Sequence, residues 1–126
     1  MEFQVQSGIY HQIAVQVMER IASGEWPAGR RIPSVRDLAT EIVVNPNTVM
    51  RAYAQLQEDG ILTNQRGVGF FVAAEGPEKV RQFKKEAFVR ELLPQVFRDM
   101  AVLGMSWEEL QAHYANFQLL TKNTQQ

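Results

Sequence analysis

The chain of 126 residues contains no cysteine, so disulfide bonds and thiolate metal sites are excluded. It also lacks any run of about 18 apolar residues, the length that a membrane-crossing helix needs. Residues 1–6 lack the basic and then apolar regions of a secretion signal. These absences favour a cytoplasmic protein that contacts no membrane.

Side chains that would form a metal site or a catalytic centre are also scarce. The two histidines, His11 and His113, lie in different predicted helices, and no cluster of carboxylates stands near them at metal-ligand spacing. No serine can be placed with a histidine and an acid in the arrangement of a hydrolase triad. We therefore expect no metal, no cofactor and no enzymatic activity.

An excess of positive charge is missing too, since 13 basic residues face 14 acidic ones and the net charge is −1. Bulk charge therefore does not indicate a nucleic-acid-binding protein. The type of base is more informative, because arginine offers the forked N–H groups that phosphates and guanine edges accept. Every basic residue before Lys79 is an arginine: Arg20, Arg30, Arg31, Arg36, Arg51 and Arg66.

The pattern of apolar residues predicts three helices in the first half of the chain. Residues 9–23 have amphipathic spacing, and Gly24 ends that helix. The stretch SVRD at 34–37 is a capping box that opens a short second helix, with Ser34 at the N-cap. Asparagine and proline at 45–46 begin the third helix, because these residues favour the N-cap and the first helical position.

The third helix, about 46–59, has two different faces. At about 100° per residue, Asn47 and Arg51 lie on a polar face, with Thr48 beside them. Apolar side chains gather on the opposite face, which is expected to enter the core: Val49, Ala52, Tyr53 and Leu56.

A β-hairpin is predicted to follow, with strands at 61–65 and 70–73 joined by a glycine-bearing turn that carries Arg66. The segment formed by Arg31 and Ile32, before Pro33, is long enough for only one edge of a small sheet. Three helices and a hairpin match a winged helix-turn-helix, whose third helix enters the DNA major groove while the wing, here about 61–73, lies on the backbone or minor groove. The expected fold class is mainly α with a small β wing, followed by a two-helix tail.

Residues on three of these elements are expected to bind DNA. The polar face of the third helix would contact base edges, and the start of the second helix would hold phosphates. Glycines in the wing would let its backbone approach the sugar-phosphate surface. The expected DNA-binding residues are Ser34, Arg36, Asn47, Thr48, Arg51, Arg66, Gly67 and Gly69.

Each of these residues also has a simpler interpretation. Arg36 and Arg51 could be surface arginines paired with Glu41 or Glu58. Ser34 is explained as a helix cap, and hairpin turns in many proteins need glycines. Their joint placement on the elements that would touch DNA favours the DNA-binding interpretation.

The second half of the chain is predicted to be a separate helical region, so the expected domains are 1–74 and 75–126. After a linker at 74–77, apolar spacing indicates one long helix that Pro94 kinks, because the hydrogen bond back to the carbonyl of Arg90 is lost. Gly104 ends this helix, and a second capping box at 106–109 opens the last one.

The apolar stripe of this tail is larger than one short partner helix can cover, so a second copy of the chain is the expected cover. Two helices are also too few to enclose a typical metabolite pocket. The alternative is a monomer whose tail folds back on its first helix. The expected dimer-interface residues are Phe83, Phe88, Leu92, Val96, Phe97, Met100 and Leu103.

Residues 24–72 resemble the DNA-binding domain of GntR-family bacterial transcription regulators; their sequence is GEWPAGRRIPSVRDLATEIVVNPNTVMRAYAQLQEDGILTNQRGVGFFV. The run NPNTVMRAY and the short tail resemble the YtrA subfamily, and the likeness extends over residues 9–73. It implies a dimer that binds an inverted-repeat operator, usually as a repressor. The broader family commonly has arginines where this chain has Pro46 and Met50, so base readout is expected to rest more on Asn47, Thr48 and Arg51. Positions that the family uses near DNA match Ser34, Arg36, Thr48, Arg51, Arg66 and Gly69.

We therefore expect a dimeric, sequence-specific transcription regulator whose partner is double-stranded operator DNA. Two alternatives stay open: a winged-helix module that binds a partner protein with the same face, and a sensor that binds an unknown small-molecule effector at the helical dimer interface. Ionic strength separates DNA binding from protein binding, because phosphate contacts weaken steeply with salt whereas an apolar protein interface changes little.

Overall fold

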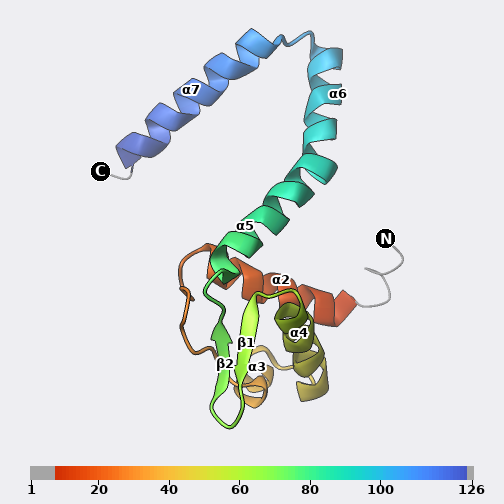
Figure 1. The fold of residues 1–126 in the computed structure, drawn as a ribbon. Coiled ribbons are helices and arrows are strands. Elements are labelled where there is room, and N and C mark those ends of the chain that lie inside the picture. The colour runs from red at the N-terminus through yellow and green to blue at the C-terminus, as the bar shows by residue number, and fades with distance from the viewer. Residues whose placement is uncertain (1–7, 125–126) are drawn as a thin grey trace. The chain divides into compact units, whose positions relative to one another are not determined.

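The computed structural model describes residues 8–124, so residues 1–6, examined above for a secretion signal, lie outside the described part. Helices predominate, with one two-stranded antiparallel sheet (Figure 1). This agrees with the predicted fold class. The elements in chain order are α2 (Gly8–Ala22), α3 (Val35–Ile42), α4 (Pro46–Glu58), β1 (Leu62–Gln65), β2 (Gly69–Val72), α5 (Gly76–Ala87), the π-helix η1 (Phe88–Leu92), α6 (Leu93–Leu103) and α7 (Trp107–Thr124).

Two compact units meet within α5, where the first unit extends to Lys84 and the second begins at Lys85. The start of α5 belongs to the first unit, since Val80 is completely buried in its core. Gly76 packs so closely that a Cβ there would lie 2.7 Å from the carbonyl oxygen of Ile61. The linker predicted at 74–77 is therefore wrong for its last two residues. Packing against the first unit makes α5 begin at Gly76, within the predicted linker.

Both predicted helix caps in the first unit are confirmed. The Ser34 hydroxyl accepts a hydrogen bond from the backbone N–H of Asp37 at 3.0 Å, at the start of α3. The side-chain oxygen of Asn45 accepts one from the backbone N–H of Asn47 at 2.8 Å, and Pro46 opens α4. These caps satisfy N–H groups that have no partner within their own helix.

The core of the first unit is built around α4, which packs on both α2 and α3. The predicted apolar face is confirmed, because its four residues are no more than 1% exposed. Among them, Tyr53 donates its hydroxyl hydrogen to the carbonyl oxygen of Pro33 at 2.8 Å, and its ring meets that of Phe70 edge-on at 4.9 Å. Burial raises the pKa of Tyr53 above its ordinary value.

The hairpin pairs Leu62 with Val72 at its base and Gln65 with Gly69 next to the turn. The turn is closed by a hydrogen bond from the Val68 N–H to the Gln65 carbonyl at 2.8 Å. A single antiparallel bridge joins Arg31 to Phe71, so a short third segment lies along β2. This agrees with the short sheet edge predicted at Arg31 and Ile32. The first unit is thus three helices and a wing, the arrangement of a winged helix-turn-helix.

The continuous helix predicted through Pro94 is interrupted, so that prediction is wrong in this respect. A π-helical segment separates α5 from α6, and the Leu93 N–H donates to the carbonyl of Phe88, five residues earlier. The physical reason is Pro94, which has no N–H and whose ring displaces the carbonyl of Arg90. The sequence therefore located the interruption correctly but not its form.

The end of α6 and the start of α7 lie where the sequence predicts. Gly104 adopts the left-handed conformation, φ 70°, and ends α6. The hydroxyl of Ser106 accepts a hydrogen bond from the Glu109 N–H at 3.1 Å and starts α7. Among residues 8–124, no helix is both long enough and apolar enough to span a lipid bilayer.

Candidate nucleic-acid interface

The first turn of α4 presents short polar side chains at the surface. Pro46 is followed by Asn47, which is exposed, and by Thr48, which is half-buried. Val49, next in the chain, is completely buried. Because the apolar side of α4 is used for the core, the amide and hydroxyl groups of its first turn are left to contact another molecule.

Arg51, one turn further along α4, is exposed as predicted but has a partner within the fold. Its guanidinium lies 4.2 Å from the centre of the ring of Tyr10, a buried residue of α2. Such a cation–π contact holds the side chain in place. The alternative pairing with Glu41 or Glu58 is not found, and Glu41 accepts a hydrogen bond from Arg20 at 2.6 Å instead.

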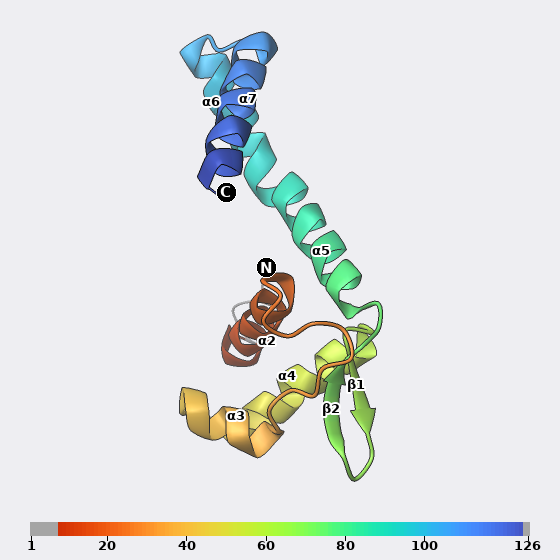
Figure 2. The same cartoon turned by 90° about the vertical axis from the view of Figure 1, so that its left-hand side faces the viewer.

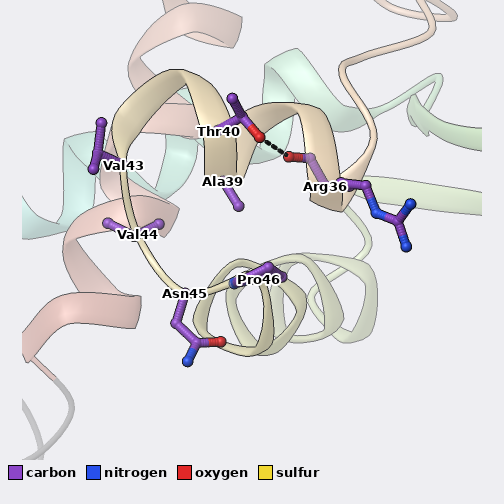
Figure 3. Close-up of a pocket in the computed structure, with 7 residues that line it drawn as sticks. All are labelled: Arg36, Ala39, Thr40, Val43, Val44, Asn45 and Pro46. Carbon is purple, nitrogen blue, oxygen red and sulfur yellow. Dashed lines mark hydrogen bonds between the residues drawn. The ribbon is translucent and has the colours of Figure 1, made fainter.

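The start of α3 contributes a cap and an arginine. The Ser34 hydroxyl oxygen accepts the capping bond and keeps its O–H hydrogen to donate. The Arg36 side chain is exposed and, within residues 8–124, forms no ion pair. Figure 3 shows the guanidinium of Arg36 pointing away from the other residues around the open hollow between α3 and α4. Arg36 is therefore available to an anion from outside.

A strained residue lies in the same hollow, at the turn that joins α3 to α4. Val43 has φ 57° and ψ 59°, and it is the one non-glycine residue of the described chain with positive φ. A β-branched side chain is rare in this conformation. Its side chain is 85% exposed, so burial does not compensate for the strain.

The wing carries Arg66 at its turn, exposed and without an acidic partner among the described residues. Gly67 has φ 77°, which the turn itself requires, and no atom lies within 4 Å of the position that a Cβ would occupy. Gly69, with φ 145°, is different because a Cβ there would meet the side chain of Arg31. The sequence marked Arg31 as a strand edge but missed its contact with the wing.

These features lie on one side of the first unit. In Figures 1 and 2, α3, the start of α4 and the turn of the wing all face the same end. Glu41 of α3 is already engaged, since it pairs with Arg20. Arg31, Arg36 and Arg66 are left without carboxylate partners in the described chain.

The described residues contain no group of three histidine, aspartate or glutamate side chains that could hold a metal ion. The exposed polar and cationic side chains of α3, α4 and the wing favour a surface for a polyanion.

The family model for bacterial regulatory proteins of the gntR family matches residues 9–72. The HTH-type transcriptional repressor YtrA of Bacillus subtilis is 37% identical over 102 residues, which cover 81% of this chain and 78% of YtrA. These relatives are transcription regulators and not enzymes, in agreement with the prediction from the sequence.

Solved structures share the fold as well. A GntR-family protein from Bacteroides thetaiotaomicron has a TM-score of 0.75 and 38% identity, over 90% of this chain and 98% of that one. BusR of S. agalactiae, solved with its busAB promoter DNA, has a TM-score of 0.57 and 26% identity, over 90% of this chain and 56% of BusR. From the matched family model and these likenesses, the chain belongs to the GntR family of bacterial transcription regulators and is YtrA-like.

Proposed function

We propose that this GntR-family regulator is a dimeric repressor that binds an inverted-repeat DNA operator. The observation that carries the proposal is that the start of α3, the polar first turn of α4 and the turn of the wing face the same end of the first unit (Figure 1). The first of these bears the unpaired Arg36 and the last the unpaired Arg66. The names of two relatives support it, because YtrA of Bacillus subtilis is a repressor and BusR was solved on promoter DNA.

In this proposal α4 enters the major groove, and two half-sites lie about one helical turn or more apart. Asn47 and Thr48 contact base edges, and Arg51 reaches a base or phosphate from its position on Tyr10. Ser34 and Arg36 hold a flanking phosphate at the start of α3.

The wing completes the contact with the sugar-phosphate backbone. Arg66 binds a phosphate or lies in the minor groove, and Gly67 lets the backbone of the wing come close. At Gly69 the missing side chain leaves room for the side chain of Arg31 instead. These contacts fix the position of the protein on DNA, while the residues of α4 supply sequence preference.

The tail is proposed to form the dimer. Within the described chain Phe88 is 47% exposed and Phe97 is 50% exposed, although both lie on the apolar stripe. Water contact with so much apolar surface is unfavourable, and a second copy removes it. An effector site between two tails stays a prediction, because it would be completed only by the second chain.

The proposal is tested by fluorescence anisotropy with the full chain, a labelled duplex from its own upstream DNA and a scrambled duplex, at two salt concentrations. We expect tighter binding to the upstream duplex and a steep loss of affinity with salt, as several neutralised phosphates require. Equal, salt-insensitive binding to both duplexes would contradict the proposal and favour a protein partner for the same face.

A further inference from the structure

Arg31 occupies a defined place beside the wing. Its backbone bridges that of Phe71, and the bridge is flanked by hydrogen bonds from the Ile32 N–H to the Phe70 carbonyl and from the Val72 N–H to the Arg30 carbonyl, each 2.9 Å. Residues opposite each other in a sheet point to the same face, and so do residues two apart on a strand. Arg31 and Gly69 therefore share the face of the wing turned away from the core.

The side chain of Arg31 lies directly on Gly69. A Cβ added to Gly69 would be 2.9 Å from Nε of Arg31, 3.4 Å from its Nη2 and 3.6 Å from its Cζ. Because Gly69 pairs with Gln65 next to the turn, the guanidinium reaches the end of the wing that also carries Arg66. The absence of a side chain at Gly69 thus gives Arg31 a route along the wing toward its turn.

The guanidinium of Arg31 has unused hydrogen-bonding capacity. The residue is exposed, and no carboxylate of residues 8–124 pairs with it. Its neighbour Arg30 differs, because Nη1 of Arg30 donates to the carbonyl of Glu25 at 3.3 Å. An arginine has five N–H donors in a fork that fits a phosphate group.

We propose that Arg31 is a phosphate-binding residue of the wing, acting beside Arg66 on the sugar-phosphate backbone of the DNA duplex. The inference rests on the proposed function, since it needs the wing to lie along DNA. It adds a contact without base specificity, so Arg31 strengthens binding to operator and scrambled duplexes alike.

The test compares Arg31→Gln with Arg30→Gln in the full chain, by anisotropy over a series of salt concentrations. Both changes remove one positive charge from adjacent residues, but only Arg31 is expected to displace a counterion from DNA. We expect Arg31→Gln to reduce the slope of log affinity against log salt by about 0.9, to weaken both duplexes by the same factor, and to leave thermal unfolding unchanged. Arg31→Lys should keep most of the slope.

Three results would overturn the assignment. Arg31→Gln with the slope of the parent would show that Arg31 contacts no phosphate. An equal change in Arg30→Gln would show a general charge effect. A loss confined to the upstream duplex would show a base contact. A parent protein whose affinity for both duplexes is weak and insensitive to salt would instead overturn the proposed function, and this assignment with it.

Discussion

Arg51 has a position that serves both the fold and a DNA contact. A guanidinium that stacks on an aromatic ring uses its face, whereas its N–H groups lie in its plane and stay available at the edge. Tyr10, 8% exposed, therefore provides a support that favours one rotamer of Arg51. Less side-chain entropy is lost when such a residue binds DNA.

Arg51→Ala is expected to weaken binding to the upstream duplex by about 1–3 kcal/mol, the value of a good bidentate base contact. It should also lower the free energy of unfolding by about 0.5–1 kcal/mol, because the contact with Tyr10 is lost. Anisotropy and thermal unfolding measure the two effects separately. Tyr10→Phe keeps the ring and serves as the control, and unchanged affinity in Arg51→Ala would contradict the assignment.

Val43→Gly is expected to stabilise the protein by about 0.5–1 kcal/mol. Glycine relieves the strain of the positive φ, and the gain exceeds the larger chain entropy that glycine loses on folding. The matched control is Val44→Gly, which removes a side chain packed against the core and should destabilise the protein. Thermal unfolding of both variants checks the prediction, and a lower melting temperature for Val43→Gly would refute it.

At the scale of elements, α4 is fixed by a bond that crosses the core. The Tyr53 hydroxyl donates to the Pro33 carbonyl, just before the cap of α3, so a partly buried polar contact holds together the two helices of the proposed DNA-contacting face. A partly buried carbonyl that loses its donor destabilises the fold. We therefore expect Tyr53→Phe to lower the free energy of unfolding by about 1–2 kcal/mol at neutral pH.

The same residue makes stability depend on alkaline pH. Burial raises the pKa of Tyr53 in the folded chain, so the neutral phenol is favoured there. Its contribution to stability is complete below about pH 10, the ordinary pKa of tyrosine, and is lost as pH rises through the folded pKa. Unfolding midpoints measured from about pH 7 to 11 should fall less in Tyr53→Phe than in the parent. Tyr114→Phe, at a 62% exposed position, should behave like the parent.

What the sequence predicts well at this scale is local. Asn45 and Pro46 indicate the start of α4 because a cap depends on residues within one turn. The contact of the Arg31 side chain with Gly69 cannot be predicted from local sequence, because it depends on strand pairing between distant parts of the chain. A glycine directly before the second predicted strand, together with an arginine in the predicted short edge, is the signal that could have revealed it.

The contact of Arg51 with Tyr10 was missed for a related reason. Helical periodicity shows that Arg51 lies off the core face of α4, but it does not show which side chain of α2 lies beside it. The form of the break before Pro94 was also beyond the sequence, because proline only removes a bond and does not choose between a bent α-helix and a π turn.

For the whole molecule, the proposed dimer depends on the tail. Phe97→Asp places a charge on the apolar stripe of α6, so we expect loss of the dimer and weaker DNA binding, because each half-site is then bound independently. Sedimentation at micromolar concentration gives the oligomeric state. The matched control is Val102→Asp on the same helix, at an 84% exposed position turned away from the stripe. A Phe97→Asp variant that remains dimeric would contradict the proposal.

The two tryptophans of the chain lie in different compact units and in opposite surroundings. Trp26 is 4% exposed and lies beneath the guanidinium of Arg20, whereas Trp107 at the start of α7 is 60% exposed. Indole emits at longer wavelength in water than in an apolar core. The fluorescence spectrum is therefore the sum of a shorter-wavelength band from Trp26 and a longer-wavelength band from Trp107. Trp107→Phe would leave Trp26 as the reporter of the first unit, and the difference from the parent would follow the tail. The protein thus carries an optical label on each half.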